Sequence, residues 1–326
     1  MRRKRNSKAK YGYIFCIPFV VAFLMFQLYP IIYTGIIGFT DLRGMGKTDF
    51  QFLAEPFKNF QQILKTPSFK TSLSNTLYIW MLNFIPQIVL ALILAAWFTS
   101  HRNKIKGQGA FKVLFYMPNI ITAATIALLF GSLFGFPIGP VNDILMKFGF
   151  IKERINFPLD RGISQGVVAF IQFWMWYGYT MIVLISGVLG MNPELFEASD
   201  IDGATGIQTF FFVTLPNLRT ILLFTLITSM IGGLQMFDIP KLYIYNGGPD
   251  NATLTTSLFI YRQAFDGSYM YNRAAAASMI MFLFITALSA IVFYLMRDKY
   301  AIAQAKAIKK LEKERRRAEK AAKGVA

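Results

Sequence analysis

Acidic side chains are concentrated in one segment of this chain, 190–219, which lies between two long apolar stretches. The segment holds four acids and one base: Glu194, Glu197, Asp200, Asp202 and Arg219. Glu197 and Asp200 are three positions apart, so on a helix both carboxylates share one face. Such a face offers negative charge to a basic cleft on a partner protein. The alternative is an acidic surface hairpin that binds nothing.

The rest of the sequence offers little for catalysis or metal binding. His101 is the only histidine and Cys16 is the only cysteine, so a histidine-based metal or catalytic site and an internal disulfide are both excluded within the chain. The segment 44–48, GMGKT, looks like part of a phosphate-binding loop, but Asp41 stands where that loop needs its first glycine. We therefore expect no cofactor, metal or ATP site here. A membrane-embedded enzyme is the least favoured function.

The acidic segment has the local pattern of a helix, a turn and a second helix. Asn192 can cap a helix start, and Pro193 suits the first helical position. Two of the acids follow in the early turns, where the helix dipole favours negative charge. Asp202-Gly203 is a helix-stop and turn signal. We expect a second helix after it, and Pro216 to mark the return toward the flanking apolar stretch.

Long stretches without Asp, Glu, Lys or Arg must position this hairpin. The chain is 55% hydrophobic and only 16% charged over 326 residues. Six charge-free stretches occur, at 11–40, 71–100, 113–142, 162–193, 220–237 and 274–296. A membrane-crossing helix needs about 20 apolar residues, and an open sheet edge cannot be satisfied in lipid. The pattern predicts an all-α polytopic membrane protein with six transmembrane helices. A large soluble protein with buried helices fits it poorly.

Basic residues predict the orientation of these helices. Segment 1–10 is a basic tail, which places the N-terminus in the cytoplasm. Six crossings return the C-terminus to the same side, where 301–326 is a basic helix or tail. The net charge of +17 is mostly a topology signal and need not mean nucleic-acid binding. The first apolar run is too long for a signal peptide. We expect a single transmembrane domain, 11–300, with the loops 41–70, 143–161 and 238–273 outside.

The predicted spans contain no ionisable residue, which disfavours a proton- or sodium-coupled carrier. A sugar path would instead use amide, hydroxyl and aromatic side chains. The candidates lie in the second, fourth and fifth spans and, for Asp238, just after the fifth: Asn83, Gln87, Gln172, Trp174, Trp176, Tyr177, Tyr179, Gln235, Phe237 and Asp238. For more than half of the aromatic residues, an interfacial belt or ordinary helix packing is the alternative.

Several residues of the hairpin carry a family resemblance. They are Glu197-Ala198-Ser199, Asp202-Gly203-Ala204, Phe210 and Val213-Thr214-Leu215-Pro216. Together they resemble the EAA signature of importer-type ABC transporter permeases, whose pattern is E-A-A, two residues, D-G-A, a gap and I-x-L-P. Ser199 replaces an alanine of that pattern and Val213 an isoleucine. The match covers about 20 positions at fixed spacing.

The resemblance implies a type I ABC importer permease fold and a role for the hairpin. In that family the loop, here about 191–219, is a coupling helix that inserts into a cleft of a cytoplasmic ATPase subunit. The ATPase-coupling residues would be Glu197, Ala198, Ser199, Asp202, Gly203, Ala204 and Pro216. ATP and Mg would be bound by that partner chain. The expected partners are a second homologous permease, two ATPase subunits and an extracytoplasmic solute-binding protein, in the bacterial cytoplasmic membrane.

Three further segments resemble the carbohydrate branch of these permeases, with its maltose-type members: Asn75-Thr76-Leu77, Tyr116-Met117-Pro118 and Asn246-Gly247-Gly248-Pro249. In the family, the stretch before the Gly-Gly-Pro turn contributes to the translocation path, which favours Gln235 and Asp238. The resemblance implies a permease subunit of an oligosaccharide importer. Glycerol phosphate or another polar solute is the alternative cargo, and a stand-alone facilitator or channel is the alternative function.

Overall fold

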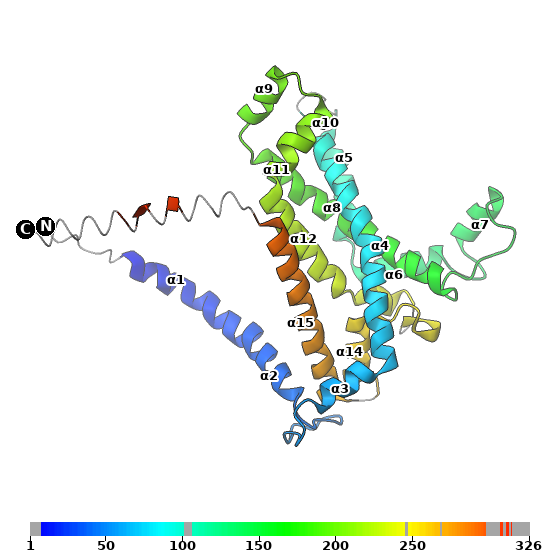
Figure 1. Cartoon of the computed structure of the whole chain (residues 1–326). Helices are drawn as coiled ribbons and strands as arrows, with labels where there is room; N and C mark the ends of the chain where they lie inside the picture. Colours follow the sequence, from blue (N-terminus) through cyan, green and yellow to red (C-terminus); the bar gives the residue numbers. More distant parts are fainter. Residues whose placement is uncertain are drawn as a thin grey trace, which may run out of the picture. The chain divides into compact units, whose positions relative to one another are not determined.

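The computed structural model describes residues 8–100, 106–244, 247–267 and 269–297, with a few positions between 307 and 314 (Figure 1). Its helices are α1 (Lys8–Phe23), η1 (Leu24–Leu28), α2 (Tyr29–Ile37), α3 (Lys58–Lys65), α4 (Pro67–Phe98), α5 (Gln108–Ile120), α6 (Ala123–Leu133), α7 (Pro140–Lys147), α8 (Arg161–Leu189), α9 (Glu194–Ile201), α10 (Gly206–Gln208), η2 (Thr209–Thr214), α11 (Leu215–Asn217), α12 (Arg219–Leu234), α13 (Asp238–Leu242), η4 (Pro249–Asn251), α14 (Thr256–Phe265) and α15 (Tyr271–Met296). The predictions for the N-terminal tail 1–7, His101, Asn246 and most of the tail 301–326 lie outside the described residues.

The chain divides into two compact units. Unit 1 comprises 1–85, 120–175 and 232–286, and unit 2 comprises 86–119, 176–231 and 287–326. The acidic segment lies wholly in unit 2. The outer loops predicted from the sequence lie wholly in unit 1.

Within the described residues, five helices are long and apolar enough to cross a membrane, and the bent pair α5 and α6 makes a sixth span if the two are counted as one. The five are Tyr11–Ile37, Pro67–Phe98, Arg161–Leu189, Arg219–Leu242 and Tyr271–Met296. Each overlaps a charge-free stretch of the sequence, because an apolar segment in lipid satisfies its backbone groups within its own helix. The all-α membrane fold predicted from the sequence is thereby confirmed.

The third predicted span is not one straight helix. α5 and α6 meet at a bend of 92°. Pro118 lies in the last turn of α5, and Thr122 starts α6 by accepting a hydrogen bond from the Thr125 amide at 3.3 Å. α6 then ends at Leu133, so the last third of the predicted span is loop and α7. A charge-free run shows that a segment is apolar but not in which direction its helix axis runs. The sequence pattern therefore could not predict the bend.

The first span is exposed along almost all of its length. Every residue from Tyr11 to Tyr33 is exposed, and the span comes close to α15 near its C-terminal end. The π-helical turn Leu24–Leu28 interrupts it just before Pro30. Proline has no N–H to donate to the helix ladder, and a π turn is a common local adjustment in such helices.

Unit 1 is organised around a buried amide. The Nδ2 of Asn75 donates to the carbonyls of Asn251 at 2.8 Å and Leu254 at 3.1 Å. Its Oδ1 accepts from Arg161 Nη2 and from Gln165 Nε2, both at 3.0 Å. Because every donor and acceptor of this side chain is used, Asn75 ties α4 and α8 to the turn that carries η4. That turn directly follows the Gly-Gly-Pro segment singled out in the sequence.

Unit 2 is held by close helix approaches at two glycines of α8. A Cβ on Gly178 would lie 2.1 Å from the carbonyl oxygen of Phe115 in α5. A Cβ on Gly187 would lie 2.7 Å from side-chain atoms of Leu218 and Ile221. The first contact is with backbone and cannot yield by a rotamer change, so α8 and α5 depend on glycine at this position.

Candidate functional site: the acidic hairpin

The acidic hairpin, residues 190–219, begins with the cap predicted from its sequence. The Oδ1 of Asn192 accepts from the Glu194 amide at 3.2 Å, and its Nδ2 donates to Glu194 Oε2 at 3.0 Å. α9 starts at Glu194, immediately after Pro193. The helix start is therefore fixed by local chemistry, with Glu194 and Glu197 both in its first turn.

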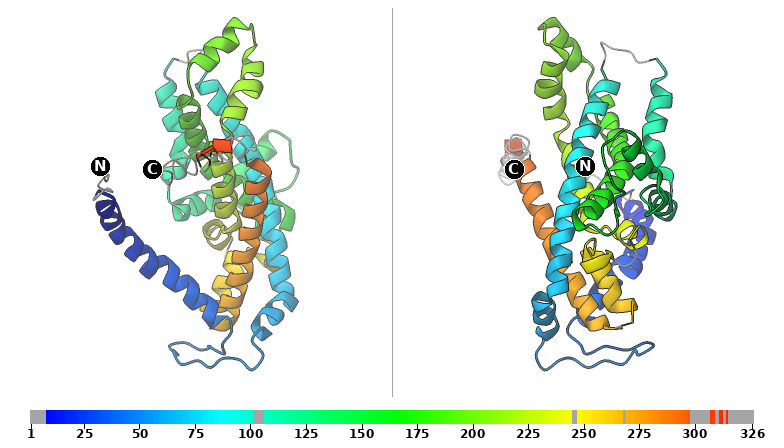
Figure 2. Two further views of the ribbon diagram at one scale, coloured as in Figure 1. Left: turned by 60° about the vertical axis from the view of Figure 1, so that its left-hand side comes forward. Right: turned by 90° about the vertical axis from the view of Figure 1, so that its right-hand side faces the viewer.

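α9 ends where the Asp202-Gly203 pair predicted a stop. Gly203 has φ +71°, a left-handed conformation that glycine adopts without steric cost. Its amide donates to the Asp200 carbonyl at 3.1 Å, and the Ala204 amide donates back to the Ser199 carbonyl at 3.0 Å. This pattern satisfies the last carbonyls of the helix and reverses the chain. Figures 1 and 2 show the chain folding back after α9.

The returning arm starts with a capping box. Thr205 Oγ1 accepts from the Gln208 amide at 3.4 Å, and Gln208 Oε1 accepts from the Thr205 amide at 2.7 Å. The Thr-x-x-Gln pattern that marks such a box is present in the sequence and is a local signal for this helix start. Next comes the π-helical turn η2, and Pro216 lies in the short helix α11 that follows.

Ser199 joins the two arms of the hairpin. Its side chain is buried, its hydroxyl donates to the Phe196 carbonyl at 2.9 Å, and it lies 3.2 Å from Thr209 Oγ1 on the returning arm. Ser199 replaces the alanine of the family pattern, and we expected no more than a small change in shape there. In this chain the substitution adds a polar contact between the two arms of the hairpin.

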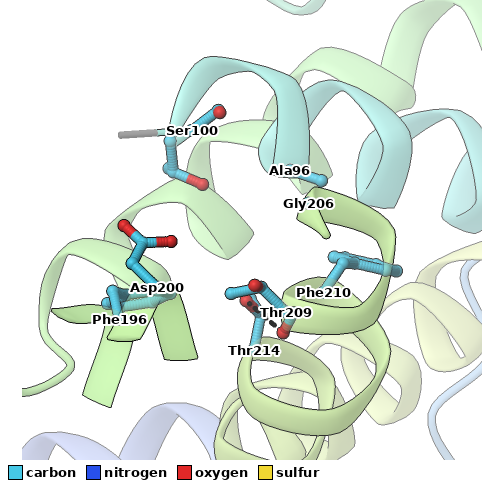
Figure 3. Close-up of a pocket in the computed structure, with 9 residues that line it drawn as sticks. Ala96, Ser100, Phe196, Asp200, Gly206, Thr209, Phe210 and Thr214 are labelled. Carbon is cyan, nitrogen blue, oxygen red and sulfur yellow. Dashed lines mark hydrogen bonds between the residues drawn. The ribbon is translucent and has the colours of Figure 1, made fainter. Parts of the chain in front are cut away.

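A small cavity of about 70 Å³ lies behind the hairpin, within unit 2. Figure 3 shows the side chains around it. They come from the end of α4, from α9 and from the returning arm: Ala96, Thr99, Ser100, Phe196, Asp200, Gly206, Thr209, Phe210 and Thr214. The end of α4 thus lies beside both arms. A displacement of the hairpin would therefore also act on this membrane-spanning helix.

The outer face of the hairpin combines free acids with apolar side chains. Glu197 and Asp202 are exposed and have no ion pair or hydrogen bond from their side chains within the described part of the chain. Ile201 is 86% exposed and Ile207 is 73% exposed, one on each side of the Gly203 turn. Sequence reasoning missed these two isoleucines, although apolar residues beside a polar turn were a usable signal.

The base of the hairpin is fastened by Arg219. Its Nε donates to the Met296 carbonyl at 2.6 Å, and its Nη2 donates to the Arg297 carbonyl at 2.9 Å. These carbonyls end α15 and have no partner within that helix. The single cation of the acidic segment therefore connects the start of α12 to the end of α15, and it does not neutralise the acids of the hairpin.

The substrate-path candidates of unit 1 differ widely in exposure. Gln235 and Asp238 are exposed and Gln172 is half-buried, whereas Asn83 is buried with its Nδ2 bonded to the Ile79 carbonyl at 2.9 Å. Asn83 therefore satisfies its amide group within its own helix. Gln235 and Asp238, three positions apart at the end of α12, remain the more accessible polar groups.

Phe237 belongs to an aromatic cluster with a cation. Its ring centroid is 5.1 Å from that of Tyr261, and Lys241 Nζ lies 3.5 Å from the Tyr261 centroid and 5.1 Å from that of Phe237. An ammonium over aromatic faces is attracted by the ring quadrupoles. Lys241 and Tyr261 were not among the predicted residues, because the contact joins α13 to α14 and leaves no local sequence signal.

Trp174 lies in unit 1, partly buried against the hydrophobic core, and the remaining candidates lie in unit 2. Trp176 is exposed, and Tyr177 is buried with its ring 6.3 Å from that of Phe115. Gln87 is buried and donates to Thr180 Oγ1 at 2.8 Å. Gln87 thus joins α4 to α8, and Tyr177 packs against α5. Both have structural contacts of their own. Their predicted role in a substrate path stays a prediction.

Potential metal ligands do not cluster in the described ranges. No three His, Cys, Asp or Glu side chains there lie close enough to hold a metal ion.

Known proteins resemble this chain over most of its length. Residues 66–300 match the family described as binding-protein-dependent transport system inner membrane component. The chain is 31% identical over 304 residues to the lactose transport system permease protein of Rhizobium radiobacter, covering 90% of this chain and 98% of that one. It is 30% identical over 276 residues to the arabinooligosaccharides transport system permease protein of Bacillus subtilis, covering 84% and 85% of the two chains.

The fold is also similar to solved structures. A chain in the crystal structure of a bacterial ABC transporter involved in the import of the acidic polysaccharide alginate superposes with a TM-score of 0.71 at 20% identity, covering 88% of this chain and 95% of that one. A second structure of such a transporter, in complex with an alginate pentasaccharide-bound periplasmic protein, gives 0.72 at 23% identity, covering 88% and 94%. The protein is thus a transport subunit and not an enzyme, and it belongs to the family of inner membrane components of binding-protein-dependent transport systems.

Proposed function

We propose that this chain is one of two permease subunits of an ATP-driven importer of oligosaccharides in the bacterial cytoplasmic membrane. It works with a second, homologous permease, two cytoplasmic ATPase subunits that bind ATP and Mg, and an extracytoplasmic solute-binding protein. The family membership and the saccharide named for both relatives support this role. Glycerol phosphate or another polar solute is the alternative cargo.

The observation that carries the proposal is the outer face of the acidic hairpin. Glu197 and Asp202 are exposed acids without partners in the described chain, and Ile201 and Ile207 expose most of their surface beside them. The capping box and the Ser199–Thr209 contact hold this face in one shape. Apolar anchors surrounded by unpaired charge, on a preorganised element, are what a protein-binding surface requires.

In the proposed mechanism the hairpin transmits motion. An ATPase subunit holds α9 through a basic cleft, with the two isoleucines as apolar anchors. When the ATPase subunits close, the hairpin moves as a unit, because the Gly203 turn and the Ser199–Thr209 contact hold the two arms together. Arg219 and the end of α4 pass this motion to membrane-spanning helices. Alternating access of the permease pair follows from that displacement.

Uptake by vesicles that contain all subunits tests the proposal. Labelled oligosaccharides and glycerol phosphate are offered with ATP enclosed, with and without the binding protein. We expect saccharide uptake that needs ATP hydrolysis, and its loss in a variant carrying Ile201→Ser and Ile207→Ser. Uptake by vesicles without the ATPase subunits, unaffected by the double substitution, would establish the facilitator instead. Uptake of glycerol phosphate alone would show that glycerol phosphate is the cargo. The proposed coupling mechanism would then stand unchanged.

A further inference from the structure

Two adjoining hollows lie between α2 and α15 in unit 1. The larger has a volume of about 510 Å³ and is bounded by α2, the 42–48 loop, α14 and the first turns of α15. The smaller, of about 210 Å³, continues along the same two helices. Thr34 and Ser278 line both hollows, so they form one groove, named here the α2–α15 groove. Figures 1 and 2 show α2 beside the first turns of α15.

The length of the groove matches one leaflet of a bilayer. On α15 its lining extends from Tyr271 to Phe282. At a rise of 1.5 Å per residue this is about 16 Å. The hydrocarbon core of a membrane is about 30 Å thick, so one leaflet is about 15 Å. Both helices are membrane-spanning segments, and the groove therefore extends along them as far as one acyl chain would.

Much of the lining is apolar, and small side chains leave space between the two helices. Ile37, Ala274 and Ala275 are buried residues of the lining. Ser278 donates its hydroxyl hydrogen to the Ala274 carbonyl at 2.9 Å, so it presents no unsatisfied donor to the groove. The apolar part of this lining suits an apolar occupant such as an acyl chain. Its volume is in the range of sites that bind small molecules.

One end of the groove carries a cation. Lys47 lines this end and is exposed, in a turn where Gly44 and Gly46 have positive φ. Neither a hydrogen bond nor an ion pair is recorded for its ammonium group within the described ranges. The arrangement is an apolar slot about one leaflet long, with an unpaired positive charge at the loop end.

We infer that the groove binds a membrane phospholipid, with one acyl chain between α2 and α15 and the phosphate beside Lys47. A helix of another subunit would fill the apolar part, but its apolar surface offers no anion to Lys47. A free phosphate would pair with Lys47 and leave the apolar walls empty. A phospholipid carries both features at the required separation. The bound lipid would fix the otherwise exposed first span against α15.

The first test counts lipid on the full-length protein. The chain is purified from membranes with its native partners in a mild detergent, and retained phospholipid per chain is measured by mass spectrometry. Lys47→Gln removes the charge at an exposed position and leaves the core intact. Loss of an exposed ion pair reduces binding by up to about fivefold, and we expect a reduction of that size. The matched control is Lys58→Gln, an exposed cation of the same loop region that does not line the groove.

The second test identifies what occupies the groove. A benzophenone amino acid replaces Tyr33, which lines the groove and is 41% exposed, and the membranes are illuminated. A phospholipid adduct is the expected product. Crosslinking to another polypeptide would overturn the inference and show that a neighbouring subunit fills the groove. Equal lipid retention by the Lys47→Gln and Lys58→Gln variants, or no lipid on the unmodified protein, would overturn it as well.

Discussion

Charge reversal at Glu197 tests the coupling role of the acidic hairpin most directly. Glu197 is exposed and has no partner in the described chain, so its replacement removes no contact within the protein. Its position in the first turn of α9 means that a lysine there loses a favourable helix-dipole interaction of about 0.3–1 kcal/mol. The free energy of unfolding should therefore change little.

The effect on partner binding should be much larger. Removing one member of a desolvated charge pair at an interface costs about 2–5 kcal/mol. Since about 1.4 kcal/mol is a factor of ten, the dissociation constant should rise roughly 30-fold at the lower limit and more with reversed charge. Binding of the purified ATPase subunits to the purified permease pair gives this constant directly, and co-purification from membranes gives a second reading.

Two further variants make the test specific. Glu197→Gln keeps the size of the side chain and should lie between the original protein and Glu197→Lys in affinity. Glu153→Lys makes the same charge reversal at an exposed acid of the loop before α8, predicted to face outside, and should leave ATPase binding unchanged. Unaltered ATPase affinity in Glu197→Lys, or equal losses in Glu197→Lys and Glu153→Lys, would refute the coupling role.

Three other predictions concern the elements around the hairpin. Gly178→Ala should lower the unfolding temperature by several degrees, since its Cβ would meet a backbone oxygen at 2.1 Å, whereas Gly166→Ala, with open space around it, should be neutral or stabilising by up to about 1 kcal/mol. Arg219→Gln removes two charge-assisted hydrogen bonds of about 1.5–3 kcal/mol each, so amide hydrogen exchange should accelerate at the end of α15 and not at its start. Gly203→Ala strains a left-handed residue by about 1 kcal/mol and should weaken ATPase binding, while Gly206→Ala, with no positive φ and open space, should not.

The sequence by itself determined the spans and the turn of the hairpin. Charge-free runs of this length predict membrane helices because lipid leaves an apolar chain few other ways to satisfy its backbone. The Asp202-Gly203 stop and the Asn192 cap were also predictable, since each depends on hydrogen bonds within a few residues. The Thr205–Gln208 box belongs to the same class and was available in the sequence.

Only the tertiary structure decided which distant residues meet. Nothing in the local pattern pairs Arg219 with the end of α15, 77 residues away, or Lys241 with Tyr261. The bend between α5 and α6 was hidden for a related reason, because hydropathy carries no information on direction. Local hydrogen bonding and solvent preference leave a pattern in the sequence. The packing of separate helices depends on the shapes of surfaces that residues far apart in the chain build together. Such packing therefore leaves no local pattern in the sequence.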